Sequence, residues 1–136
     1  MAATVVDRQQ AVPRAKAACK RAAELVLPGR KLVVALVDDA EIAALHLRFL
    51  GLAEPTDVLS FDDGEIVVSG ETARREAEAR GIDPRRELVL YVVHGALHLA
   101  GHGDSTPAQR KRMRAAERRA LEQLGLGDVY AARRKR

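Results

Sequence analysis

A long, mostly apolar segment that carries histidines is the feature that most restricts what this sequence can fold into. Asp83 and Pro84 are typical of an N-cap followed by proline at the first helical position, and Gly101 can end the helix. The segment between them is rich in leucine, valine and alanine, which predicts a helix packed inside the fold. Its histidines therefore cannot be explained as part of a solvated helix face.

Two of these histidines are spaced to bind one metal ion. His94 and His98 are four residues apart, so on a helix their rings share one face, with Cβ atoms about 5–6 Å apart. After Gly101 the chain can turn back, and either His102 or Asp104 can then supply a third ligand. Three protein ligands with an open position for water are the arrangement of a catalytic zinc site.

Length and composition indicate one domain, residues 1–136, without disulfide bonds. Cys19 is the only cysteine, which excludes a disulfide framework and a cysteine-rich zinc site and favours a reducing compartment. The sequence shows no signal peptide and no apolar run of about 18 residues, so we expect a soluble, cytoplasmic protein. Aromatic residues make up only 3%, which argues against a base-stacking platform.

Helical and extended patterns alternate along the chain. Helices are predicted over 13–27, 38–49, 71–80, 84–101 and 106–125, and strands over 31–37, 58–61 and 65–69. The turn at 62–64 predicts a tight hairpin between the last two strands, and Thr106 to Gln109 predicts a capping box. This order predicts an α/β or α+β fold in which helices cover a small mixed sheet.

Positive charge is concentrated at the C-terminal end. Residues 110–136 contain ten lysines and arginines against three acidic residues. Arg110, Arg114 and Arg118 are four residues apart and form, with Lys111, a basic stripe on the predicted helix. This basic helix and tail, about residues 107–136, fits a nucleic-acid contact, although a solvated helix face can carry the same charges.

Three motifs follow one another along the chain: PTDVLSF at 55–61, GEIVVS at 64–69 and HGALHLAG at 94–101. Together they resemble the motifs of the YbeY family of bacterial metal-dependent endoribonucleases, and the similarity extends over roughly residues 10–125. The resemblance implies a single compact α/β domain with a zinc-type ion on the histidine helix. It also implies single-strand-specific cleavage in 16S ribosomal RNA 3′-end maturation, ribosome quality control, and the small ribosomal subunit or its proteins as partners.

The first departure from the family pattern concerns the third metal ligand. The family motif has a histidine ten residues after the first one, and this chain has Asp104 there. A carboxylate oxygen can replace imidazole on zinc at about 2.0–2.2 Å. The spacing of the motif favours Asp104 as the third ligand, with His102 as the alternative.

The second departure concerns an arginine. Counted back from Pro55, Leu50 occupies the position of the functional arginine that the resemblance implies. Arg48 is the nearest replacement, but on a helix it points about 200° away, so it substitutes only if the helix ends early or the register shifts. We therefore expect the basic stripe to provide the main RNA contact.

Three functions remain open from the sequence. The leading one is a metal-dependent endoribonuclease with His94, His98 and Arg48 as catalytic residues and one divalent ion, expected to be Zn²⁺. A water activated by the ion, or Asp57, would have to serve as base. The second is a non-catalytic ribosome-assembly factor with a structural metal. The third, peptide hydrolysis, is disfavoured because Gly95 stands where such metalloproteases carry glutamate.

Overall fold

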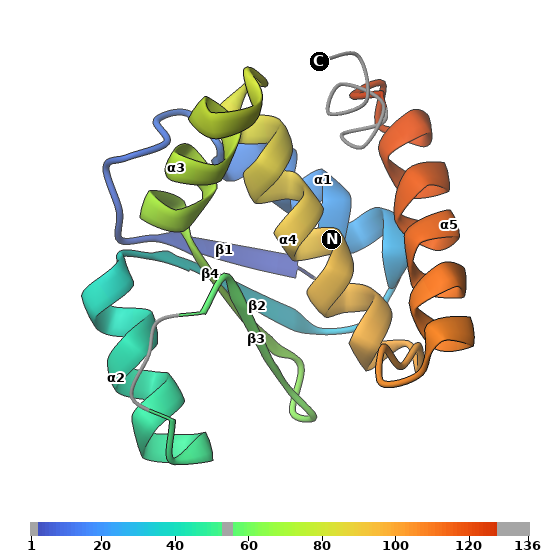
Figure 1. Ribbon diagram of the computed structural model, residues 1–136, viewed down its shortest axis with the longest axis horizontal. Helices are drawn as coiled ribbons and strands as arrows, with labels where there is room; N and C mark the ends of the chain where they lie inside the picture. Colours follow the sequence, from blue (N-terminus) through green and yellow to red (C-terminus); the bar gives the residue numbers. More distant parts are fainter. Residues whose placement is uncertain (1–2, 53–55, 128–136) are drawn as a thin grey trace.

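A four-stranded mixed sheet with five helices forms the fold, as a computed structural model describes it for residues 3–52 and 56–127 (Figure 1). The elements are β1 (Ala3–Asp7), α1 (Lys16–Val26), β2 (Leu32–Val37), α2 (Asp39–Leu50), β3 (Val58–Phe61), β4 (Glu65–Ser69), α3 (Gly70–Arg80), α4 (Pro84–Leu99) and α5 (Pro107–Gln123). The predicted α/β fold class is therefore confirmed. The end of the predicted basic tail, residues 128–136, lies outside the described residues.

The sheet has the strand order β1-β2-β4-β3. β1, β2 and β4 run parallel, and β3 pairs with β4 in the predicted antiparallel hairpin. Sequence patterns did not predict β1, because its five residues are recognisable as a strand only through their pairing with β2, where Val5 faces Val34. β2 is an inner strand whose residues are buried apart from Val33, which is 43% exposed.

The main core lies between the sheet and the α1 and α4 helices. α4 contacts α1, α3, α5 and the β3–β4 hairpin, so it is central to the fold, while α2 covers the opposite face of the sheet (Figure 1). Cys19 on α1 is completely buried, and this burial, together with the charge of Asp7, raises the pKa of its thiol to about 12. A thiol in this state is an inert core group.

Gly95 determines how closely α4 approaches the sheet. A Cβ atom at this position would lie 2.8 Å from Cγ2 of Ile66 and 3.2 Å from Cγ2 of Val58. Only glycine therefore allows the helix to pack against β3 and β4 at this distance. Val58, against which Gly95 packs, lines the same pocket as the neighbouring His94.

The helix ends follow the local signals of the sequence. Asp38 and Asp83 accept hydrogen bonds from the backbone amides of Glu41 and Arg85, as N-caps do. The predicted capping box between Thr106 and Gln109 is confirmed at the start of α5. In the described part of the chain, no helix has both the length and the hydropathy needed to cross a membrane.

Asp39 joins the first turns of α2 and α3, and we expect its replacement to lower stability. Its carboxylate accepts hydrogen bonds from Ser69 Oγ at 2.6 Å, Thr72 Oγ1 at 2.7 Å and Arg75 Nη1 at 2.6 Å. Partial burial opposes the charged form, but these three donors outweigh it and lower the pKa of Asp39. Asp39→Asn should therefore reduce the free energy of unfolding by about 1–3 kcal/mol at pH 7.

The pH dependence of this loss provides a second readout. A carboxylate with a lowered folded pKa stabilises the protein above its unfolded pKa of about 4, and the contribution disappears as the pH falls through the folded value. In urea unfolding, the difference between wild type and Asp39→Asn should thus shrink in acid. Glu78→Gln, at an exposed ion pair with Arg74, is the matched control and should change little. A pH-independent difference would contradict the assignment.

Candidate metal centre

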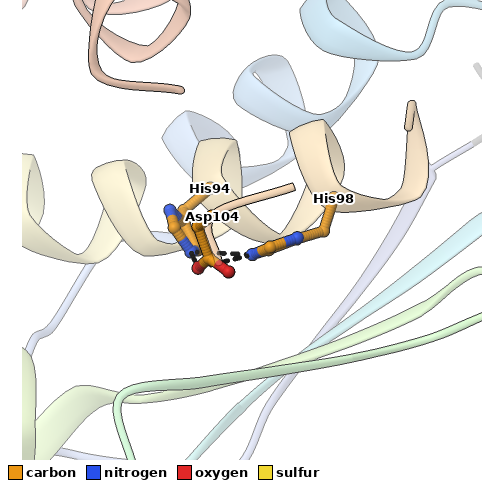
Figure 2. A group of neighbouring side chains, drawn as sticks. All are labelled: His94, His98 and Asp104. Carbon is orange, nitrogen blue, oxygen red and sulfur yellow. Dashed lines mark hydrogen bonds and ion pairs between the residues drawn. The ribbon is translucent and has the colours of Figure 1, made fainter. Parts of the chain in front are cut away.

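Three potential ligand atoms converge where α4 ends (Figure 2). Nε2 of His98 lies 3.1 Å from Nε2 of His94 and 3.1 Å from Oδ2 of Asp104, and His94 Nε2 lies 3.4 Å from the same oxygen. The two imidazole rings meet nearly edge to face, at an interplanar angle of 80°. The two nitrogens and the oxygen therefore form a compact triangle.

The separations within this triangle suit a tetrahedral metal ion. Ligands about 2.0–2.1 Å from a tetrahedral ion lie about 3.3 Å from one another, and the three separations in the structure bracket that value. Two imidazole nitrogens and one carboxylate oxygen also form a donor set that Zn²⁺ accepts. These three residues could hold a divalent ion and leave a fourth position open.

The turn after α4 places Asp104 in this triangle. Gly101 has φ +106°, and its amide donates to the carbonyl of His98, while the His102 amide donates to Leu97. The chain then reverses, and the capping box at Thr106 starts α5 directly afterwards. His102 is half-buried and is not among the grouped ligand atoms in the described residues. Of the two alternatives for a third ligand, the structure brings Asp104 to the histidines.

Glu117 on α5 is a residue of this site that sequence reasoning missed. Its Oε2 lies 2.6 Å from Nδ1 of His94, and its side chain is only 3% exposed. Burial lowers the pKa of His94, but the hydrogen bond and charge of Glu117, with the charges of Asp104 and Asp57, outweigh burial and raise it. A signal was present in the sequence, because an acidic residue interrupts the apolar face formed by Met113, Ala116, Ala120 and Leu121.

An open pocket adjoins the three grouped residues. Leu50, Asp57, Ser60 and Asp62 line it together with His94, His98 and Asp104. Its carboxylates give the pocket a negative character, which favours a cation. Asp57 thus lies in the same pocket as the three grouped residues, where a base that accepts a proton from water would have to be.

Arg48 is not among the residues that line this pocket. It lies on the exposed C-terminal part of α2, and its guanidinium carbon is 5.2 Å from the centre of the Phe49 ring. Leu50, which is 58% exposed, contributes to the pocket instead. The position that the family resemblance assigns to arginine therefore faces the site, and the side chain there is apolar.

The basic stripe lies on the helix that follows the ligand loop. Arg110 Nη1 donates to the backbone carbonyls of Asp104 and Ser105, at 3.4 and 3.1 Å. Lys111 and Arg114 are exposed and Arg118 is partly buried. The stripe therefore begins beside the grouped ligands, and its contact with nucleic acid remains a prediction.

Comparisons with known proteins agree with the motifs. A family model described as endoribonuclease YbeY matches residues 3–125. Proteins named endoribonuclease YbeY share 41% identity in Chelativorans sp. (74% of this chain, 69% of the relative), 43% in Rhodopirellula baltica (68% and 53%) and 37% in Rhodopseudomonas palustris strain BisA53 (93% and 87%). The chain thus spans between about half and nearly nine tenths of these relatives.

The fold also resembles that of a solved structure. The solution structure of TM1509 from Thermotoga maritima matches with a TM-score of 0.60 and 22% sequence identity. The match covers 89% of this chain and 90% of that one. At this level of identity the likeness concerns the fold alone.

Proposed function

This chain belongs to the YbeY family of endoribonucleases, and we propose that it is a divalent-metal-dependent enzyme that cuts single-stranded RNA. The convergence of His94, His98 and Asp104 beside an open pocket is the observation that carries the proposal. The resemblance adds the substrate: the 3′ end of 16S ribosomal RNA, with a role in ribosome quality control. The partners would be the small ribosomal subunit or its proteins, in the cytoplasm.

Each group of residues at the site would have its own role in RNA hydrolysis. His94, His98 and Asp104 would hold one ion, for which the donor set favours Zn²⁺. Such an ion supplies Lewis-acid polarisation of a phosphoryl oxygen and acidifies a water molecule. Asp57, in the same pocket, is the candidate for taking the proton from the attacking water. The basic stripe on α5 would attract and orient the RNA backbone.

One observation favours a second candidate function. The pocket has Leu50 where the resemblance implies an arginine, and the guanidinium of Arg48 lies over Phe49. If no arginine from α2 reaches the scissile phosphate, the chain would bind RNA and protein as a non-catalytic assembly factor, with the metal holding the fold. Arg48 can therefore be a catalytic residue only if its guanidinium reaches the phosphate that is cut.

Peptide hydrolysis is disfavoured by geometry as well as by motif. In metalloproteases of the HExxH type, a glutamate after the first histidine acts as general base. In this chain that position is Gly95, which faces Ile66 and Val58 of the sheet at distances too short for a Cβ atom. A glutamate at position 95 would not fit against the sheet.

An RNA cleavage assay separates the two leading functions. Metal-loaded protein would be incubated with end-labelled single-stranded RNA that contains a 16S 3′ precursor sequence, with a duplex of the same sequence as control. We expect new RNA ends with the single strand only, their loss on chelation and their return on addition of Zn²⁺. The same protein would also be incubated with ribosomes. If it binds RNA but cuts neither the free RNA nor the RNA in ribosomes, the result would support the assembly factor instead.

The basic stripe predicts how strongly RNA binding depends on salt. Arg114→Ala should reduce the slope of log affinity against log salt by about 0.7–1, with no change in sequence preference, because one phosphate contact is lost. Arg118→Ala should act alike. The effect of Arg110→Ala is harder to interpret, because Arg110 also donates hydrogen bonds to the backbone carbonyls of Asp104 and Ser105. If these variants keep the wild-type slope while Arg48→Ala loses it, the stripe is a solvated face and Arg48 holds the phosphate.

A further inference from the structure

We infer that Glu117 is a positioning residue that sets the tautomer and the orientation of His94 at the metal centre. The inference rests on the proposed function, because it concerns the same site. It goes beyond that proposal by assigning a role to a residue on α5 that none of the three sequence motifs contains.

The contact defines which nitrogen of His94 carries the hydrogen. Glu117 Oε2 lies 2.6 Å from His94 Nδ1, and an ionised carboxylate can only accept hydrogen bonds. The hydrogen therefore sits on Nδ1. Nε2 of the neutral ring is left with its lone pair, and this atom lies 3.1 Å from His98 Nε2 and 3.4 Å from Asp104 Oδ2. Glu117 thus presents the metal-binding nitrogen of His94 to the other ligands.

The two histidines are held differently. Within residues 3–52 and 56–127, the imidazole ring of His98 makes hydrogen bonds only through Nε2, to His94 and Asp104. His94 is bonded at both ring nitrogens, and the bond at Nδ1 comes from a residue 23 positions along the chain. His94 is therefore the fixed ligand, and His98 can adjust to the ion.

Burial of the charged Glu117 side chain lowers the stability of the fold, so stability by itself does not explain its position. It is 3% exposed on the face of α5 that also buries Met113 and Leu121, where an apolar side chain would pack without desolvating a charge. The short bond to His94 compensates part of this cost. A carboxylate bonded to the outer nitrogen of a ligating histidine is a common partner in metal sites, and its loss typically weakens metal binding about 10–100-fold.

Two variants of Glu117 and one control test this role. Glu117→Gln keeps the size but removes the charge, and Glu117→Leu also removes the acceptor. Glu87→Gln is the matched control, because Glu87 is likewise 3% exposed in its side chain but pairs with Arg80. Zn²⁺ affinity would be measured by competition with a chelator, and the His94 tautomer by long-range ¹H–¹⁵N NMR of the metal-free protein at a pH where the ring is neutral.

We expect Zn²⁺ binding about 10-fold weaker in Glu117→Gln and up to about 100-fold weaker in Glu117→Leu. The hydrogen of His94 should sit on Nδ1 in the wild type and shift toward Nε2 in Glu117→Leu. Glu87→Gln should lower stability and leave both readouts unchanged. If Glu117→Leu does not fold, the Zn²⁺ affinity of Glu117→Gln provides the test.

The possible failures can be told apart. Wild-type Zn²⁺ affinity and tautomer in both Glu117 variants would overturn the role of Glu117 and leave the metal centre intact. Equal weakening by Glu87→Gln would also overturn it, since the effect would then follow from lost stability. A wild-type protein that binds no Zn²⁺ would overturn the metal centre and this inference together.

Discussion

His98→Ala is expected to abolish stoichiometric metal binding and, with it, RNA cleavage. His98 Nε2 is 3.1 Å from each of the two other ligand atoms, so its removal leaves two ligands and breaks the triangle. The loss should exceed the about 10–100-fold that removal of an outer partner costs, because the variant removes a proposed direct ligand. The side chain is partly exposed, so the variant should fold.

Elemental analysis of protein purified without a histidine tag provides the measurement. The wild type should carry about one divalent ion per chain, and His98→Ala close to none. Circular dichroism would check that the variant is folded. Unchanged metal content in His98→Ala, or a wild type without metal that was never exposed to chelator, would contradict the site.

Asp104→Ala should lower metal content far more than His102→Ala. The Asp104 carboxylate lies within hydrogen-bond distance of His98, whereas His102 contributes its backbone amide to the end of α4. Removal of the Asp104 side chain leaves only the two histidines of the group, but removal of the His102 side chain leaves all three proposed ligands in place. Asp104→His should retain or tighten the metal, because it restores the ligand type of the family motif.

His102→Ala serves as the matched control in this comparison, since it changes a residue of the same loop. Metal content would be compared by elemental analysis, and affinity by chelator competition. The reverse order, with His102→Ala the more damaging, would show that the loop after Gly101 presents the other side chain to the ion.

Local patterns were sufficient to predict most of the elements and the core of the site. The strands at 58–61 and 65–69 and the capping box at Thr106 were predicted at the positions where they are found. The spacing of His94 and His98 placed their rings on one face, as the structure has them. Such features depend on residues within about four positions of one another, where helix and turn geometry follow from the sequence.

Contacts between distant segments decided the rest. β1 is a strand because it pairs with β2, and Leu50 reaches the pocket because α2 lies beside β3. Glu117 meets His94 across the α4–α5 interface, and Gly95 is required by the approach of α4 to Ile66. Periodicity shows that a residue is buried but not which residue it faces. The sequence alone therefore placed His94 and His98 on one helix and favoured Asp104 over His102 through the motif spacing. Only tertiary packing brought the Asp104 carboxylate to the two histidines and supplied the carboxylate partner of His94.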